Sequence, residues 1–132
     1  MPNTNGAILA RVKVTATNGN VEEETIPSNA AFDVVVEAEA GNNVFNSNQS
    51  YQVQMVLTDY TANFTTVTTQ NKTGNMQDAN WPTQERQHRF PIPALGAGRE
   101  DHALRAFAVL QIGSVDPIVD FEEGEVFIVT AP

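Results

Sequence analysis

The chain has 132 residues and contains no cysteine. This absence excludes a disulfide framework, a thiolate zinc site and a cysteine nucleophile. A chain of this length buries roughly two thirds of its unfolded surface, so it can form a hydrophobic core without cross-links. We therefore expect a single domain spanning residues 1–132.

Basic residues are scarce. Seven Lys and Arg stand against 16 Asp and Glu, which gives a formal net charge of −9, and the seven are scattered along the sequence. A field of this sign repels phosphate backbones and anionic lipid headgroups. We predict that the chain binds neither nucleic acid nor a membrane surface.

Long apolar runs are also missing. No stretch approaches the ~18 apolar residues that a membrane-spanning helix needs. The first six residues have no basic segment followed by an apolar one, so no signal peptide is visible. We expect a soluble chain, and its compartment stays open.

The dominant period of hydrophobicity is two. Apolar side chains occupy alternate positions in Ile8–Ala16, Ala31–Ala40 and Tyr51–Thr58, which is typical of half-buried strands. Shorter runs predict further strands at Val21–Ile26, Phe64–Gln70, Gln87–Ile92, Pro117–Phe121 and Val126–Val129. The one helical turn that we expect lies at Met76–Asn80.

Leu104–Ile112 differs from the other runs because it is apolar on both faces. Strands of this kind are normally central and covered on each side. Seven to eight short strands, separated by Gly, Asn and Pro turns, together predict an all-β fold, an antiparallel β-sandwich.

The order of these strands resembles the immunoglobulin-like or fibronectin type III sandwich across nearly the whole chain. The chain lacks that fold's marks, since it has no Cys pair, Trp81 falls in a loop, and no Tyr lies within Ala103–Ile112. The resemblance implies an architecture and no function.

Residues for hydrolytic catalysis are poorly represented. No serine sits in a Gly-x-Ser-x-Gly elbow, and only His88 and His102 can serve as a base. His88 is in phase with Phe90 and Ile92, so we expect it to cap the core at a strand end. We expect His102 to face solvent. The chain is therefore predicted not to be an enzyme.

One strand carries the outward carboxylates Asp33, Glu37 and Glu39. The adjacent strand is expected to place Arg11 and Lys13 opposite them. Opposite charges across a sheet stabilise it modestly, so these carboxylates are interpreted as structural.

Acidic residues cluster before the last strand, and Asp116, Asp120 and Glu122 are the candidate calcium ligands. Calcium takes several oxygen ligands, usually from loops. No Asp-x-Asp-x-Asp-Gly loop is present. The alternative interpretation, which we favour, is a solvated acidic surface that keeps the protein soluble.

The loop from Gly74 to Gln84 supplies a second candidate site, formed by Gln77, Asp78, Asn80 and Trp81. An indole among amides and a carboxylate can stack on a sugar or anchor a protein partner. The alternative is that Trp81 folds back and plugs the end of the sandwich.

These observations favour a non-enzymatic protein-interaction or structural module that requires no cofactor. Its partner would be another protein or a second copy, reached through a surface, a loop or an edge strand such as Phe64–Gln70 or Gln87–Ile92. The alternative function is carbohydrate- or calcium-dependent ligand binding through the Trp81 loop and residues 116–125.

Overall fold

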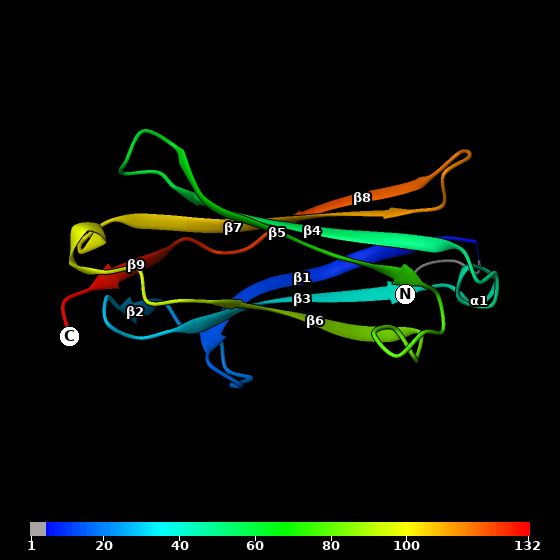
Figure 1. The fold of residues 1–132 in the computed structure, drawn as a ribbon, viewed down its shortest axis with the longest axis horizontal. Helices are drawn as coiled ribbons and strands as arrows, with labels where there is room; N and C mark the ends of the chain where they lie inside the picture. The colour runs from blue at the N-terminus through cyan, green and yellow to red at the C-terminus, as the bar shows by residue number, and fades with distance from the viewer. Residues whose placement is uncertain (1–4) are drawn as a thin grey trace.

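The computed structural model describes residues 5–132 as two β-sheets packed face to face (Figure 1). The strands are β1 (Ala7–Ala16), β2 (Thr25–Pro27), β3 (Phe32–Ala40), β4 (Ser50–Asp59), β5 (Thr65–Asn75), β6 (Glu85–Ile92), β7 (Ala103–Ile112), β8 (Ile118–Glu123) and β9 (Phe127–Thr130). The two helical segments are a short α1 (Asn42–Phe45) and a 3-10 turn, η1 (Ala97–Arg99).

Sheet A has the order β1-β3-β6 and is antiparallel, and sheet B has the order β2-β9-β7-β4-β5. Strands β8 and β9 lie along the same edge of β7. Strand β8 pairs with Phe107–Ile112, and β9 pairs with Ala103 and Leu104. They fill one strand position, interrupted after β8, and they correspond to the separate runs Pro117–Phe121 and Val126–Val129 of the sequence. The structure has nine strands among residues 5–132, where seven to eight were predicted. The pairing of β2 with β9 is parallel.

The core lies between the sheets and is made by the alternate residues that the period of two predicted. On β4, Tyr51, Val53, Met55 and Leu57 are all buried. Phe32 of sheet A meets Phe127 of sheet B edge to face, with ring centroids 5.7 Å apart. The sandwich prediction is confirmed because this inward periodicity holds on strands of both sheets.

The helical turn expected at Met76–Asn80 is wrong, because this segment is irregular turn structure. Short polar side chains such as Asp compete with helical bonding by accepting backbone N–H groups locally. Here the Asp78 carboxylate does so. The short helix instead forms at α1, in the Asn-rich segment. None of the helices in the described part of the chain is long and apolar enough to cross a membrane.

Candidate interaction surface

Trp81 is fully buried and belongs to the β5–β6 connection, which lies at the same end of the sandwich as α1 (Figure 1). Its ring packs against those of Tyr51 and His88, with centroids 5.0 Å and 4.8 Å away. The indole N–H donates to the Gln84 carbonyl at 3.2 Å. The ring plugs this end of the core, so stacking on a sugar would require it to leave the core.

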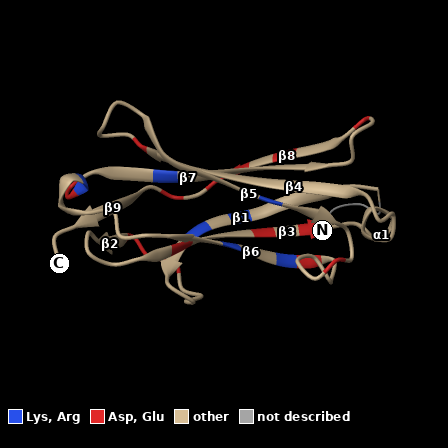
Figure 2. Ribbon diagram, in the orientation of Figure 1, with Lys and Arg blue, Asp and Glu red and all other residues tan. Residues whose placement is uncertain are grey.

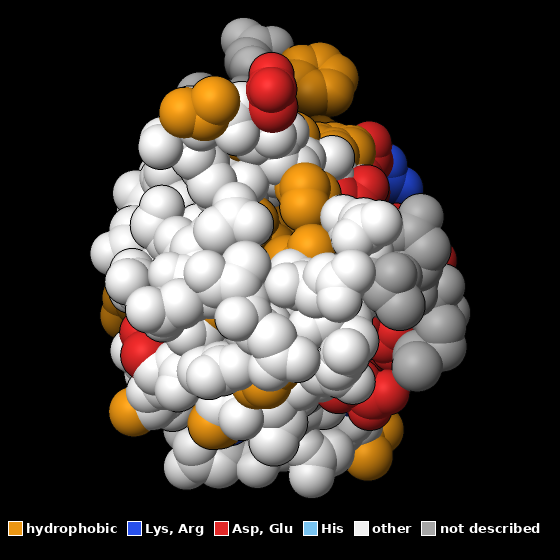
Figure 3. All heavy atoms as spheres, turned by 90° about the vertical axis from the view of Figure 1, so that its right-hand side faces the viewer, with side chains coloured by type: hydrophobic (Ala, Val, Ile, Leu, Met, Phe, Trp, Pro, Cys, Tyr) orange, Lys and Arg blue, Asp and Glu red, His pale blue; other side chains and the backbone are white. Residues whose placement is uncertain are grey.

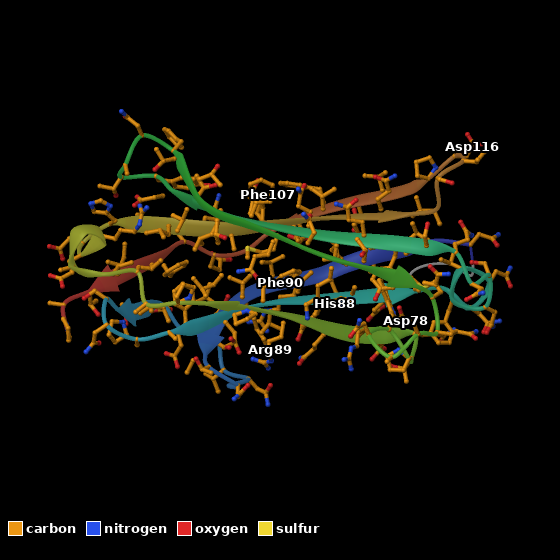
Figure 4. The ribbon with its side chains drawn as sticks, viewed as in Figure 1. Asp78, His88, Arg89, Phe90, Phe107 and Asp116 are labelled. Atoms are coloured by element: carbon orange, nitrogen blue, oxygen red, sulfur yellow. The ribbon has the colours of Figure 1, made fainter. Side chains whose placement is uncertain are left out.

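Asp78 organises the loop around this indole (Figure 4). Its carboxylate accepts the backbone N–H groups of Asn75, Asn80 and Trp81 at 2.9–3.1 Å, and the Tyr51 hydroxyl at 3.4 Å. Burial would raise the pKa of Asp78, but these hydrogen bonds outweigh it and hold the pKa below its ordinary value. The burial of Tyr51 itself, reinforced by the Asp78 charge, raises the pKa of the Tyr51 hydroxyl to about 12.

The two other candidate ligand residues of this loop are exposed. The Gln77 amide donates to the Asn46 side chain at 2.8 Å, and the Asn80 carbonyl accepts from Arg86 at 3.0 Å. All four candidates thus lie on one loop. Two of them, Asp78 and Trp81, have structural roles. Ligand binding by this loop stays a prediction.

The candidate calcium ligands are spread along β8 and the turn before it. Asp116 lies at the tip of that turn with a left-handed φ of 47° (Figure 4). The Asp120 carboxylate accepts the Leu9 N–H at 2.7 Å and so ties β8 to β1. Glu122 is half-buried two residues further along. Within residues 5–132, no three His, Cys, Asp or Glu side chains are grouped so as to share a metal ion. Calcium binding likewise stays a prediction.

The prediction that His102 faces solvent is wrong. Its Nδ1 lies 2.7 Å from Oδ2 of Asp59, which is fully buried and also accepts Arg99 at 2.6 Å. The other Asp59 oxygen accepts the Ala62 N–H. Burial would raise the pKa of Asp59, but the hydrogen bonds from His102, Ala62 and Arg99 lower it further than burial raises it. Since both oxygens have donors, this cluster ties β4 to the segment before β7.

His88 is buried, as its phase with the core residues predicted. It lies within β6 beside Trp81 and Tyr51, and its Nε2 has no hydrogen-bond partner in the described part of the chain. Burial, with the positive charges of Lys72 and Arg86, lowers its pKa to about 4 against an opposing effect of Asp78. The imidazole therefore acts as a neutral core residue at neutral pH.

Two of the three outward carboxylates of β3, Asp33 and Glu37, pair with cations of neighbouring strands, and one partner differs from the prediction. Oε2 of the third, Glu39, is buried and has no hydrogen-bond partner among residues 5–132. Glu37 lies 3.5 Å from Lys13 on β1, as expected. Asp33 is buried and pairs with Arg89 at 3.0 Å. Arg89 belongs to β6, which flanks β3 on the edge opposite to β1. The β1–β2 connection covers this region, since the Lys13 ammonium donates to the Asn20 carbonyl.

No further layer formed by residues 5–132 covers the second apolar face of β7, contrary to the prediction. Phe107 and Val109 point away from sheet A and are only half-buried, and Phe107 can be seen there in Figure 4. Val56 of β4 lies beside Phe107, and Phe121 of β8 lies beside Val109. Phe121 is 50% exposed, and Val119 of β8 is 60% exposed.

Aromatic residues extend this apolar region toward the β4–β5 turn. Arg105 lies over the Tyr60 ring, and the Phe64 ring is 5.1 Å from that of Tyr60. We use "outer face" for the surface formed by Val56, Tyr60, Phe64, Arg105, Phe107, Val109, Val119 and Phe121. Viewed from the end that carries the β7–β8 turn, hydrophobic side chains are exposed at the top of the molecule, and others are exposed in the middle and at the lower rim (Figure 3).

The outer face carries little charge. Among the described residues, the outward positions of β4, β5, β7 and β8 include two charged side chains, Arg105 and Glu123, which pair at 2.8 Å. Charged residues are more frequent on the strands of sheet A (Figure 2). Depletion of charge together with enrichment in aromatic residues and Arg is typical of the centre of protein interfaces.

Phe64 is an unusual residue for its position. Asn63 and Phe64 have φ values of 57° and 59°, and the Thr65 N–H donates to the Ala62 carbonyl at 3.2 Å. This is the geometry of a type I′ turn, whose second central residue is commonly Gly. Phe64 is nevertheless 70% exposed. A bulky residue is rarely held in the left-handed conformation, so this turn at Phe64 could not be expected from the sequence.

Comparisons with known proteins bear on the fold. The sequence matches no protein-family model and no curated protein. Among solved structures, the chain is similar to red sea bream transglutaminase, with a TM-score of 0.53 and 15% identity over 92% of this chain. A β-glucuronidase from Bifidobacterium dentium gives a TM-score of 0.45 and 15% identity over 94% of this chain. The chain spans 16% and 18% of the lengths of these two proteins.

Proposed function

We propose that this chain is a non-enzymatic protein-interaction module that binds its partner through the outer face of sheet B. The observation that carries the proposal is the uncovered apolar side of β7, where Phe107 and Val109 lie beside Val56 and Phe121. A contiguous exposed apolar patch with a polar rim is uncommon on a protein that works alone, and it is typical of interaction sites.

The edge strands support this proposal less well than the face does. Lys72 of β5 points toward the core, in register with buried Val53, and its ammonium lies 5.3 Å from the centre of the Phe90 ring. Inward-pointing charges protect a sheet edge from pairing with another strand. On β6, Pro91 has no N–H to donate, and its carbonyl already accepts Gln70 of β5 at 2.9 Å.

We also propose that the sandwich is of the immunoglobulin-like kind. In support, the orders β1-β3-β6 and β9-β7-β4-β5 match the A-B-E and G-F-C-C′ arrangement of that fold. This assignment concerns architecture and adds nothing about the partner.

The proposal is tested by comparing tagged wild type with the double variant Val119→Ser and Phe121→Ser in quantitative capture from native lysate. Val21→Ser serves as the control, because Val21 is 74% exposed in the β1–β2 connection. A protein retained by wild type and by the control, but lost with the double variant, is expected. If wild type retains no protein specifically and does not self-associate, the proposal is wrong.

A further inference from the structure

We infer that the partner of the outer face is a second copy of this chain, which packs the same face against itself around a two-fold axis. This inference rests on the proposed function and names its partner. The two sheets B would stack as the sheets of a sandwich do, at about 10 Å separation. The contact would be isologous, so each residue meets its counterpart or a neighbour of its counterpart across the axis.

The shape of the surface favours a copy of itself. A twisted sheet presents a saddle rather than a dome or a bowl. A saddle fits a copy of itself turned about a two-fold axis in the interface, because the rising direction of one meets the falling direction of the other. In Figure 1 the β4–β5 turn rises at one end of sheet B and the β7–β8 turn rises at the other. The outer face lies between these two turns.

The outer side of sheet B, with the polar side chains of β5 included, approaches the extent of a specific dimer interface. Strands β8, β7, β4 and β5, about 4.8 Å apart and with about eight residues each at about 3.4 Å per residue, give a flat footprint of roughly 500 Å² per copy. Within this footprint β5 contributes outward Thr and Asn side chains to the rim of the outer face. Projecting side chains raise the accessible area above this flat value. Specific interfaces bury about 800 Å² per partner, and most crystal contacts bury less than about 400 Å².

The electrostatic setting decides how such a dimer should respond to salt. Each copy carries a net charge of −9, which opposes association, whereas the outer face is nearly neutral because Arg105 and Glu123 pair within one copy. Salt screens the long-range repulsion and leaves apolar burial intact. Self-association through this face should therefore strengthen as the salt concentration rises.

Val109 is the residue with which to test the geometry, since it lies at the centre of the face on the central strand β7. The experiment measures molar mass by light scattering and sedimentation at protein concentrations from about 1 to 100 μM, a range that reports dimers of moderate affinity. Wild type is expected to exceed the monomer mass of 14.4 kDa and to approach twice that value. Val109→Asp and Val109→Lys should each raise the dimer Kd at least about tenfold, because like charges would face each other across the axis.

Mixing the Asp and Lys variants should restore the dimer, because opposite charges then meet. Val21→Asp, a charge in the β1–β2 connection, should leave the dimer unchanged, and circular dichroism should show that every variant is folded. Val119→Lys provides a second disrupting variant at a more exposed position, should Val109 variants fail to fold.

A wild type that stays monomeric at every concentration would overturn self-pairing, while a captured heterologous protein could still support the proposed function. A dimer that survives both Val109 and Val119 substitutions would place the contact elsewhere and overturn the inference. A dimer that is lost in both single variants and not regained on mixing would overturn the two-fold geometry.

Discussion

Acidification should destabilise the protein through a single buried imidazole. The ring of His88 is 1% exposed, packs against Tyr51 and Trp81, and offers an Nε2 that has no partner. A proton added there would place an uncompensated charge in the core, with the cationic Lys72 and Arg86 nearby. The folded state therefore favours the neutral ring, which is why the pKa falls to about 4.

The magnitude follows from linkage. The ordinary pKa of His, which applies to the unfolded chain, is 6.5, and the folded value is about 4. Between these values the unfolded state binds more protons, so the free energy of unfolding rises with pH. The contribution of His88 is fully present above pH 6.5 and is lost as the pH falls from 6.5 to about 4. At about 1.4 kcal/mol per pKa unit, the total loss is about 3 kcal/mol.

The assay is urea unfolding at several pH values between 7 and 4.5, followed by the fluorescence of Trp81, the one tryptophan. His88→Phe should flatten the pH dependence in this window. Asp59 and Asp78 have pKa values below the ordinary 3.8, so their contributions are lost mainly at lower pH. If His88 titrates near 6.5 by NMR, or if His88→Phe shows the wild-type slope, the burial argument is refuted.

Three further predictions concern stability, each measured as the free energy of unfolding in urea. Trp81→Ala should cost about 3–5 kcal/mol, since it empties the end of the core; a loss below about 1 kcal/mol would mean that the indole does not plug it. Asp59→Asn should cost about 3 kcal/mol because it breaks a buried charge cluster, whereas Glu123→Gln, in an exposed pair, should cost less than about 1 kcal/mol. Phe64→Gly should stabilise the chain by about 0.5–1 kcal/mol through relief of the left-handed backbone, and Phe64→Ala should not.

The strands could be predicted from the sequence because burial on one side imposes a period of two. β1 and β3 agree with the predicted runs to within one residue, since alternation is continuous along each. β5 extends to Asn75, five residues beyond the predicted Gln70, because both of its faces are polar and no alternation marks its end. Its register depends on the neighbouring β4, which is a tertiary effect.

The outer face, the proposed interaction surface, could only partly be predicted from the sequence. The apolar residues on both sides of Leu104–Ile112 were recognised, but composition cannot tell a covered face from an exposed one. The contact between His102 and Asp59 could not be predicted, because the two residues are 43 positions apart in the sequence and meet only in the folded chain. The turn at Phe64 carries no Gly and so lacks the usual signal of a type I′ turn.

The fold shows where on the molecule the acidic residues lie. On sheet A, two carboxylates are matched by cations of neighbouring strands, in the Asp33–Arg89 and Glu37–Lys13 pairs. Further carboxylates lie in connections: Glu22 pairs with Arg11 at 2.9 Å, and the adjacent Glu23 and Glu24 are half-buried and exposed. Two copies that approach through these regions repel each other, whereas copies that approach through the outer face meet apolar and amide side chains. If two copies associate as proposed, the same acidity that argues against nucleic acid would therefore disfavour contacts through these regions and favour the proposed contact through one face of sheet B.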